Sequence, residues 1–437
     1  MRQPDERVYN RAYRGHEMII TGGNGQWELH WNSYLFWTRS FAGGITPYPS
    51  FEAALAAGKN TIDELLRVHS TPRTISVTGF RSIRDLRQFK LSELNVMVGA
   101  NGAGKSNFVD FFRLLHAMSC NNLARFVYEN GKADPFLFGG PRVTSGITAH
   151  LQFGGPVNNE YFFELIPNVN GELYLSDEKV GRGDGQMPII ESPKSESALM
   201  GLLGAGKGTD AAGCAEWVYA GISLFAVYHF HDTSTTSPVR RDVSLDDYAE
   251  LRPDGGNLAA FLHHLRQQEP SAYAQIRDLV RLVAPFFDDF VLDPERNGPL
   301  EQVRLVWRQK GSSTPMQPYQ FSDGTIRFIC LATALLQPSA PLLTVIDEPE
   351  LGLHPFALEV VASLLRDASQ RNKIIVSTQS PTLLDSFEPQ DIIVVDRAEG
   401  ASRFRRLEGG QLSNWLEDYS LGQLWRKNVI EGSPVHE

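Results

Sequence analysis

The sequence predicts an α/β fold with a parallel sheet at its core, an inserted α+β lobe and a small N-terminal α+β extension. Three observations lead to this prediction. Apolar strand-like segments alternate with helical segments between residues 342 and 396, which is typical of a parallel sheet with crossover helices. An apolar strand at 94–98 runs into a glycine-rich loop and a helix at 105–119. Short strands and helices of mixed order fill residues 110–300.

The composition is that of a soluble globular protein with room for two or three domains. Of the 437 residues, 42% are hydrophobic and 21% are charged, and no apolar run approaches the roughly 20 residues of a membrane helix. The N-terminus has no apolar segment typical of a secretory signal. Three widely separated cysteines, Cys120, Cys214 and Cys330, indicate neither a disulfide framework nor a zinc site. We therefore expect a cytoplasmic protein without a membrane partner.

The net charge of −10 bears on nucleic-acid binding. A binder that depends on phosphate contacts usually carries a basic excess. Nucleic acid thus stays possible as a partner through a local basic patch, but the overall charge does not indicate it.

Residues 1–70 are expected to form a separate N-terminal extension of unknown role, followed by a linker at 70–73. Helices are predicted at 50–58, with Ser50 as N-cap, and at 61–69, where Thr61 and Glu64 have the spacing of a capping box. Aromatic residues gather upstream: Trp27, Trp31, Tyr34, Phe36, Trp37 and Phe41. They are expected to form the core of this module. A partner surface and a base-stacking platform are the alternatives.

The loop GANGAGKS at 99–106 matches the pattern G-x-x-x-x-G-K-[ST] between a strand and a helix, the context that a phosphate-binding loop requires. Its backbone N–H groups and the helix N-terminus favour phosphate. Lys105 would reach the β- and γ-phosphates, and the Ser106 hydroxyl would bind Mg²⁺. The expected nucleotide-binding set in this loop is Gly99, Asn101, Gly102, Ala103, Gly104, Lys105, Ser106 and Asn107. The alternative is a glycine-rich turn that happens to precede Lys-Ser.

Two acids, Asp347 and Glu348, stand at the carboxyl end of the apolar strand that begins LLTVI, where open α/β sheets bind ligands. Asp347 would hold Mg²⁺ through water, and Glu348 would act as the general base that activates the attacking water. A metal ion and a triphosphate explain why two carboxylates stand side by side. These residues predict an ATPase that uses ATP and Mg²⁺. A solvated acidic turn is the alternative.

Ser322, Asp323 and Gly324 lie between these two motifs and directly before a predicted helix at 325–337. Taken alone, this sequence is an ordinary turn with a helix cap. Its position between a phosphate loop and an acidic strand end points to a signature motif instead.

The motif order, completed by STQS at 377–380, resembles that of ABC-type ATPases. The segments GFRSI (79–83), EPELGLHP (348–355) and STQSPTLLD (377–385) make the chain similar to the RecF/SMC-like branch, among predicted AAA family ATPases without a fused nuclease. The resemblance covers residues 74–437 and implies an ABC-type P-loop ATPase head, with 110–300 containing the inserted lobe.

The resemblance implies a composite site in a homodimer or higher homo-oligomer. ATP on the phosphate loop of one copy would meet Ser322, Asp323 and Gly324 of the other copy. ATP would then hold two copies together, and hydrolysis would release them. Arg81 matches an arginine that lies near the phosphates or the adenine in this branch.

Gln379 stands where many ABC-type ATPases carry a histidine that senses the γ-phosphate. An amide can hold the attacking water or the γ-phosphate, but it does not gain a proton near neutral pH as histidine does. We expect a catalytic Gln379 and slow hydrolysis with a weak pH dependence. An exposed strand-end glutamine is the alternative. Residues 131–143 also lack the glutamine that the family carries after the phosphate-loop helix, so the residue that replaces it stays open.

The sequence lacks the heptads of an SMC-type coiled coil, and little chain follows the ATPase motifs where a Toprim nuclease would stand. The resemblance to RecF/SMC-like ATPases without a fused nuclease, many of which belong to bacterial anti-phage systems, then implies a sensor or regulator of a separately encoded effector, for example a nuclease, in anti-phage defence. The alternative is a RecF-like ATPase of DNA repair or DNA ends, and a transporter subunit is the third choice.

His229 and His231 alternate along a predicted strand and point the same way. With Asp232 nearby, a metal site is conceivable. We expect a structural pair instead, because no third ligand stands at a useful spacing.

Overall fold

The computed structural model describes residues 7–14, 16–23, 26–33, 41–42, 48–155, 158–183, 187–188, 190, 194–202, 210–297 and 300–430. The chain divides into two compact units. The first unit combines Met1–Leu91 with Arg113–Leu224, and the second combines Ser92–Phe112 with Phe225–Glu437. The proposed division at residues 70–74, with an inserted lobe at 110–300, stays a prediction.

The first unit begins with an antiparallel sheet in the order β1-β2-β3-β4. Its strands are β1 (Arg7–Tyr13), β2 (His16–Gly23), β3 (Gln26–Ser33) and β4 (Phe41–Ala42). Leu29 of β3 is buried whereas Glu28 is exposed, as a strand with one covered face requires. Tyr34, Phe36 and Trp37 of the predicted aromatic cluster lie outside the described residues. Trp27 packs edge-on against Phe51, with ring centroids 5.7 Å apart.

A single helix, α1 (Phe51–Ser70), stands where the sequence predicts two. Ser50 caps it as expected, because its hydroxyl accepts from the Ala53 N–H at 3.1 Å. The predicted capping box at Thr61 was wrong, since this hydroxyl donates to the Ala57 carbonyl inside the helix at 2.9 Å. Gly58 does not end the helix either. It lets α1 approach the sheet, and an added Cβ there would lie 2.7 Å from Met18 Sδ.

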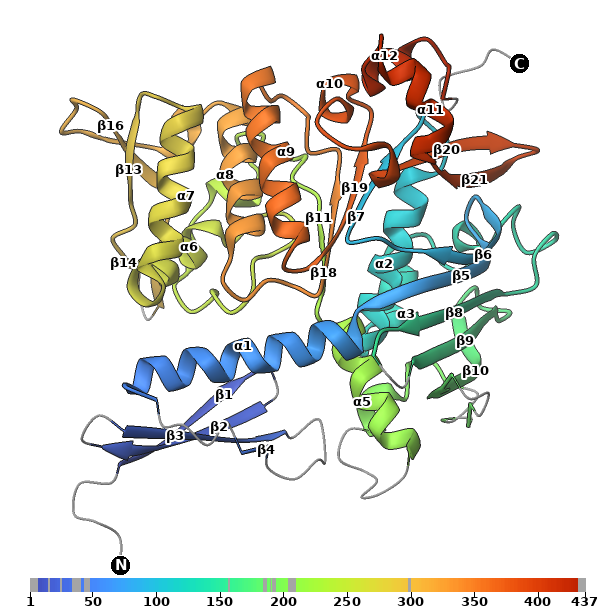
Figure 1. Ribbon diagram of the computed structural model, residues 1–437, viewed down its shortest axis with the longest axis horizontal. Coiled ribbons are helices and arrows are strands. Elements are labelled where there is room, and N and C mark those ends of the chain that lie inside the picture. Colours follow the sequence, from blue (N-terminus) through green and yellow to red (C-terminus); the bar gives the residue numbers. More distant parts are fainter. Residues whose placement is uncertain are drawn as a thin grey trace, which may run out of the picture. The chain divides into compact units, whose positions relative to one another are not determined.

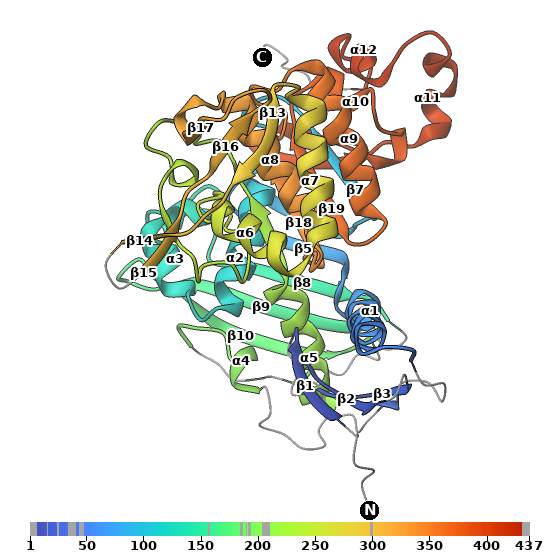
Figure 2. The ribbon, with the colours of Figure 1, turned by 90° about the vertical axis from the view of Figure 1, so that its left-hand side faces the viewer.

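A five-stranded antiparallel sheet in the order β10-β9-β8-β5-β6 forms the rest of this unit's scaffold (Figure 2). Its strands are β5 (Pro72–Phe80), β6 (Ile83–Lys90), β8 (Ile147–Phe153), β9 (Asn159–Pro167) and β10 (Leu173–Arg182). Its helical segments are α3 (Leu123–Glu129), η1 (Asp134–Phe136), α4 (Leu199–Leu202) and α5 (Asp210–Ser223). Residues alternate between buried and half-buried along β8 and β9, which identifies one face of the sheet as core.

The second unit is built on a six-stranded sheet in the order β11-β18-β19-β7-β20-β21 (Figure 1). Its strands are β7 (Leu94–Val98), β11 (Phe225–Tyr228), β18 (Leu343–Asp347), β19 (Lys373–Thr378), β20 (Ile392–Ala398) and β21 (Ala401–Arg406). All neighbours pair in parallel except β20 and β21. The predicted parallel sheet is therefore confirmed, and the carboxyl ends of five strands meet at one edge.

Helices cover both faces of this sheet, which explains why β7, β18 and β19 are buried along their whole length. Alternate strand residues such as Val96, Ile346 and Val376 share a core with α8 (Asp323–Leu336) and α9 (Pro355–Ser369). The opposite face carries α2 (Lys105–Ser119), whose Phe108 and Phe112 rings contact rings of β21 and β11.

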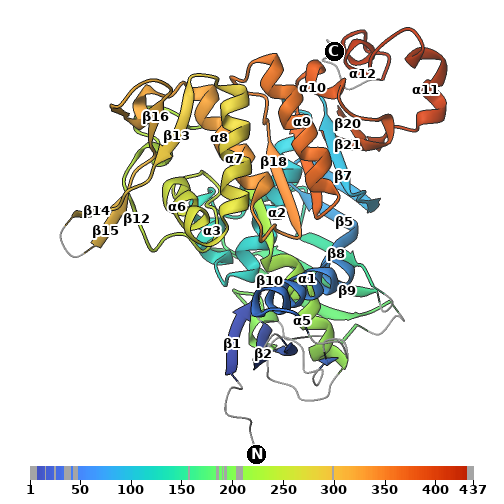
Figure 3. The same cartoon turned by 60° about the vertical axis from the view of Figure 1, so that its left-hand side comes forward.

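Further helices and two small sheets complete the second unit (Figure 3). The helical segments are η2 (Pro238–Arg240), α6 (Leu258–Gln268), α7 (Pro270–Val283), η3 (Pro318–Gln320), α10 (Pro381–Leu384), η4 (Pro389–Asp391), α11 (Gly409–Leu416) and α12 (Leu421–Arg426). The small sheets contain β12 (Val243–Ser244), β13 (Phe287–Val291), β14 (Glu295–Asn297), β15 (Leu300–Val303), β16 (Val306–Gln309) and β17 (Pro315–Met316). Within the described part of the chain, no helix has both the length and the apolar character needed to cross a membrane.

Candidate functional site

The loop between β7 and α2 has the backbone geometry of a phosphate cradle. Gly102 and Gly104 have φ values of +80° and +113°, which residues with a side chain rarely adopt. The Ser402 hydroxyl donates to the Ala103 carbonyl at 2.5 Å and ties the loop to β21. The loop is therefore fixed in a curved shape, and the N-terminus of α2 opens directly from it.

Lys105 folds back over this loop. Its ammonium donates to the carbonyls of Gly99 at 2.7 Å and Ala100 at 3.2 Å. Burial lowers the pKa of Lys105, and the nearby carboxylates, of which Glu348 has the largest effect, offset only part of this decrease. An ammonium that donates to neutral carbonyl oxygens gains from phosphate oxygens, because hydrogen bonds between two charged groups are the stronger ones.

Asp347 ends β18 beside the adjacent strand β19. The Ser377 hydroxyl of β19 donates to Asp347 Oδ1, and only 5% of Asp347 is exposed. Glu348 follows with φ +46°, a backbone conformation that costs on the order of 1 kcal/mol or more for a residue with a side chain. Its N–H donates to the Ser377 carbonyl at 2.8 Å. The two acids are thus held at the strand end by the neighbouring strand.

Gln379 contacts Glu348 directly. Its side-chain Nε2 donates to Glu348 Oε1, and its backbone N–H donates to Glu350 Oε1 at 2.6 Å. The Thr378 hydroxyl donates to the same Glu350 oxygen at 2.8 Å. Burial raises the pKa of Glu350, and the hydrogen bond from the Gln379 N–H offsets only part of this increase. The end of β19 and the segment after β18 therefore form one hydrogen-bonded unit.

A small cavity of about 120 Å³ joins these elements. Its lining residues are Asn101, Gly102, Gly104, Lys105, Ser106, Asn107, Glu348 and Gln379. Six residues predicted from the phosphate loop and both predicted catalytic residues thus face one space. Ser106 offers a hydroxyl there and Asp347 a carboxylate beside it, and such oxygen donors suit Mg²⁺. The described residues contain no group of three or more His, Cys, Asp or Glu side chains that could hold a metal by themselves.

Ser322, Asp323 and Gly324 do not line this cavity. Ser322 caps α8, where its hydroxyl accepts from the Thr325 N–H at 3.1 Å. Both Ser322 and Asp323 are exposed. Gly324 is required for packing, since a Cβ there would collide with the Gly352 carbonyl oxygen. The structure therefore places the predicted signature at an exposed helix N-terminus, apart from the phosphate loop of the same chain.

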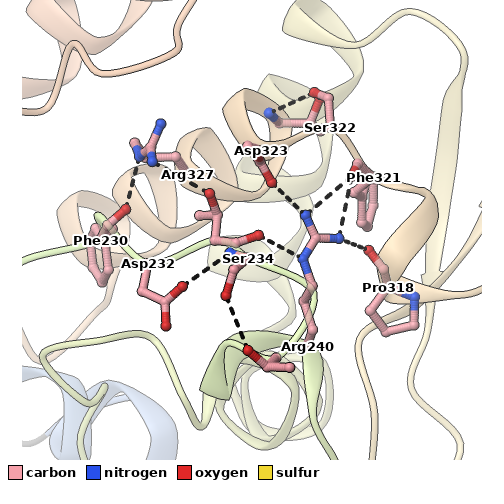
Figure 4. A network of polar contacts seen from close by, with 12 residues as sticks. Phe230, Asp232, Ser234, Arg240, Pro318, Phe321, Ser322, Asp323 and Arg327 are labelled. Carbon is pink, nitrogen blue, oxygen red and sulfur yellow. Dashed lines mark hydrogen bonds and ion pairs between the residues drawn. The ribbon is translucent and has the colours of Figure 1, made fainter.

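Two arginines with buried side chains, Arg240 and Arg327, hold the segment 318–323 and helix α8, which together carry the signature motif (Figure 4). Neither of them was identified from the sequence. The Arg240 side chain is 6% exposed and donates to the carbonyls of Pro318, Phe321 and Thr233 and to Asp323 Oδ1. Its bond to Asp323 measures 2.8 Å.

Arg327 of α8 lies on the other side of this network (Figure 4). It donates to the Phe230 carbonyl at 2.8 Å, to the His231 carbonyl at 3.0 Å and to the Leu351 carbonyl. An arginine within the apolar run TIRFICLATALL was a usable signal, because a buried charge requires such partners. The signature helix is thereby fastened to the segments that follow β11 and β18.

His229 and His231 follow β11 and reach Asp347. His231 Nε2 lies 3.2 Å from the Asp347 carbonyl oxygen, and His229 Nδ1 lies 3.6 Å from Asp347 Oδ2. Burial and the neighbouring His229 lower the pKa of His231. Asp232 is not part of this group, since it is exposed and accepts from the Ser234 N–H at 3.1 Å.

Arg81 lies in the first unit, at the turn between β5 and β6. Its φ is +47°, and its N–H donates to the Phe136 carbonyl at 2.8 Å. The guanidinium lies 5.1 Å from the centre of the Phe136 ring. A role for Arg81 near a nucleotide stays a prediction.

Comparison with known proteins places the chain in a family. The family model described as "AAA domain, putative AbiEii toxin, Type IV TA system" matches residues 94–197 and 219–385, more than half of the chain. None of the curated protein sequences matches the chain as a relative.

Among solved structures, an SMC head bound to the C-winged helix domain of ScpA is similar. It shares 15% identity at a TM-score of 0.52, covering 79% of this chain and 99% of that one. An SMC head with an extended coiled coil, bound to the C-terminal domain of ScpA from Pyrococcus furiosus, gives 14% identity and a TM-score of 0.49, over 80% of this chain and 99% of that one. At such identities only the fold is shown, and the second score adds nothing to it. The chain belongs to the family of AAA domains described as putative AbiEii toxin of type IV toxin–antitoxin systems, and its fold is that of an SMC-like, ABC-type ATPase head.

Proposed function

We propose that this protein binds ATP and hydrolyses it slowly, that two copies clasp the nucleotide, and that the assembly regulates a separately encoded effector in defence against phage. The observation that carries the ATPase is the cavity shared by the phosphate loop, Glu348 and Gln379. Phosphate-binding groups, a carboxylate base and an amide that bonds to this base meet there.

Each residue has a distinct part in the proposed reaction. Lys105 exchanges its contacts with the Gly99 and Ala100 carbonyls for the β- and γ-phosphate oxygens. Ser106 and Asp347 would hold Mg²⁺, which supplies charge neutralisation on the phosphates when bound. Glu348 accepts the proton of the attacking water. Gln379 keeps the Glu348 carboxylate turned toward the cavity.

The proposed dimer follows from the place of the signature. Ser322 and Asp323 are exposed at the N-terminus of a 14-residue helix, and neither lines the cavity of the same chain. A hydroxyl, an N–H and a helix N-terminus suit an anion. A second copy brings these groups to the γ-phosphate, so that ATP lies between two chains.

The regulatory role rests on the family. Its description names a toxin of a type IV toxin–antitoxin system, and the pairing of a toxin with an antitoxin supports a second, separately encoded protein. The alternative that the sequence suggests, a RecF-like ATPase for DNA repair or DNA ends, is opposed by the net charge of −10. Stimulation of turnover by DNA, with a steep loss at higher salt, would favour that alternative.

The test of the ATPase is the substitution Glu348→Gln. It removes the base but keeps the shape of the side chain, so ATP binding should persist while kcat falls by about 100-fold or more. Binding is measured by calorimetry with ATP and Mg²⁺, and turnover by phosphate release. Normal hydrolysis by this variant would contradict the assignment of the base.

A further inference from the structure

The end of β11 carries two imidazoles that the proposed function does not use. β11 pairs in parallel with β18, and Tyr228 lies opposite Ile346 in the register. The next residues of both strands therefore emerge at the same edge of the sheet, which is the ligand-binding edge of open α/β folds. His229 thus stands beside Asp347 although more than 100 residues separate them in the sequence.

The two imidazoles lie near different oxygen atoms of Asp347. His231 Nε2 contacts the Asp347 backbone carbonyl at 3.2 Å. His229 Nδ1 faces the carboxylate, 3.6 Å from Oδ2, and this buried nitrogen makes no hydrogen bond to the described residues. The rings lie against each other with centroids 3.7 Å apart. His231 is therefore held by the backbone, while His229 offers a nitrogen at the carboxylate.

The backbone that carries this pair is fixed. Arg327 donates to the carbonyls of Phe230 and His231, at 2.8 Å and 3.0 Å, and Figure 4 shows it reaching Phe230 from the signature helix. The His229 N–H donates to the Pro253 carbonyl at 2.9 Å. Hydrogen bonds thus fix the backbone of His229 itself and of the two residues that follow it.

We propose that His229 Nδ1 is a direct ligand of the divalent cation that Asp347 holds beside the nucleotide, and that Asp347 Oδ2 binds this cation directly as well, in place of the water-mediated contact expected from the sequence. With metal–ligand bonds of about 2.1 Å, two ligand atoms on one cation lie about 3.0–3.6 Å apart, so the separation of His229 Nδ1 and Asp347 Oδ2 fits a shared ion. The inference rests on the proposed function, because the described protein side chains do not complete a metal site and nucleotide oxygens must supply the remaining ligands.

An imidazole ligand changes which cation the site prefers. Carboxylates, hydroxyls and phosphates suit Mg²⁺, whereas imidazole nitrogen suits transition metals. The selectivity of this site for Mn²⁺ or Co²⁺ over Mg²⁺ is therefore larger than that of a site with oxygen ligands alone. Replacing His229 with glutamine restores an oxygen donor and removes this preference.

The test uses the full chain with Glu348→Gln to prevent turnover, loaded with ATP and Mn²⁺. Electron spin-echo measurements detect a nitrogen bound directly to Mn²⁺. We expect a ¹⁴N signal that changes when the histidines are labelled with ¹⁵N, which separates imidazole from adenine nitrogen without altering the protein. His229→Gln abolishes the histidine signal, and the matched control His231→Gln retains it. Competition between Mn²⁺ and Mg²⁺ shows the Mn²⁺ preference falling by about tenfold in His229→Gln.

The outcomes separate the two proposals. Bound ATP and Mn²⁺ without a signal that responds to the histidine label would overturn the ligand role of His229 and leave the nucleotide site intact. A labelled signal that survives His229→Gln would overturn it as well. Failure of the unaltered protein to bind ATP, measured on the same sample, would refute both the nucleotide site and this inference.

Discussion

Replacing Gln379 with alanine removes the hydrogen bond to the proposed base and leaves the rest of the site in place. In the structure Gln379 Nε2 donates to Glu348 Oε1. The backbone N–H of residue 379 still donates to Glu350 after the substitution, since this bond does not involve the side chain. The end of β19 therefore keeps its position, and the change isolates the orientation of Glu348.

The expected magnitude follows from the kind of bond that is lost. A hydrogen bond to a charged group contributes about 1.5–3 kcal/mol. If this orienting energy is lost from the transition state, kcat falls by about 10- to 100-fold, because each 1.36 kcal/mol corresponds to a factor of ten. ATP affinity should change little, since Lys105 and the loop N–H groups hold the phosphates.

The assay compares phosphate release and ATP binding for Gln379→Ala with a matched control, Gln390→Ala. Gln390 Nε2 also donates to a glutamate carboxylate, Glu388, but at an exposed position in η4. The control should keep normal turnover. Unchanged turnover in Gln379→Ala would refute the role of this amide and favour a glutamine that merely ends the strand.

Two further predictions concern stability. Arg240→Met leaves the buried carbonyls of Pro318 and Phe321 without their donor, so the free energy of unfolding should fall by about 2–4 kcal/mol. Urea unfolding measures this, and a loss no larger than that of the neighbouring control Arg241→Met, whose Nε donates only to Thr236 at an exposed position, would contradict the role given to Arg240. His16 is 2% exposed, and burial lowers its pKa from 6.5 to about 4. The unfolded chain binds the proton more readily than the folded protein. The contribution of His16 to the free energy of unfolding is therefore fully present above about pH 6.5, and roughly 2–3 kcal/mol of it is lost as the pH drops to about 4. His16→Gln should flatten this part of the pH–stability curve, and an unchanged curve would show that His16 is not the cause.

The phosphate loop and the acidic strand end could be predicted because the residues of each motif are close together in the sequence. Gly102, Gly104 and Lys105 stand within one loop, and Asp347 and Glu348 are neighbours in sequence. A short spacing between a strand, a loop and a helix is enough to place such residues. The parallel sheet was also predictable, because its buried strands read as continuous apolar runs.

The contacts that the sequence did not predict join distant segments of the chain. The family's glutamine, which follows the phosphate-loop helix, was sought within 131–143, a segment of the first unit. The strand beside β18 is instead β11, and its end brings His229 to Asp347. Arg240 likewise meets the Pro318–Phe321 segment about 80 residues downstream. No spacing rule reports such contacts, because the strand order of the sheet decides them.

Helix α1 shows a different limit. Gly58 and the polar residues after it suggested a helix end, since glycine commonly ends helices. In the structure Gly58 lets α1 pack closely against Met18 of the sheet. This packing outweighs the low helix propensity of glycine. Tertiary packing thus made one helix of two predicted ones.

The central claim is that ATP is held between two copies of the chain, and the most direct measurement is the mass of the protein in solution with ATP and Mg²⁺. Glu348→Gln prevents release, so this variant should shift from 48.7 kDa without nucleotide to twice that mass, or a higher even multiple, with ATP. Adding Ser322→Arg to the same variant blocks the exposed cap of α8 and should keep ATP binding while the mass stays that of one chain. An ATP-loaded Glu348→Gln protein that remains at 48.7 kDa would contradict the account.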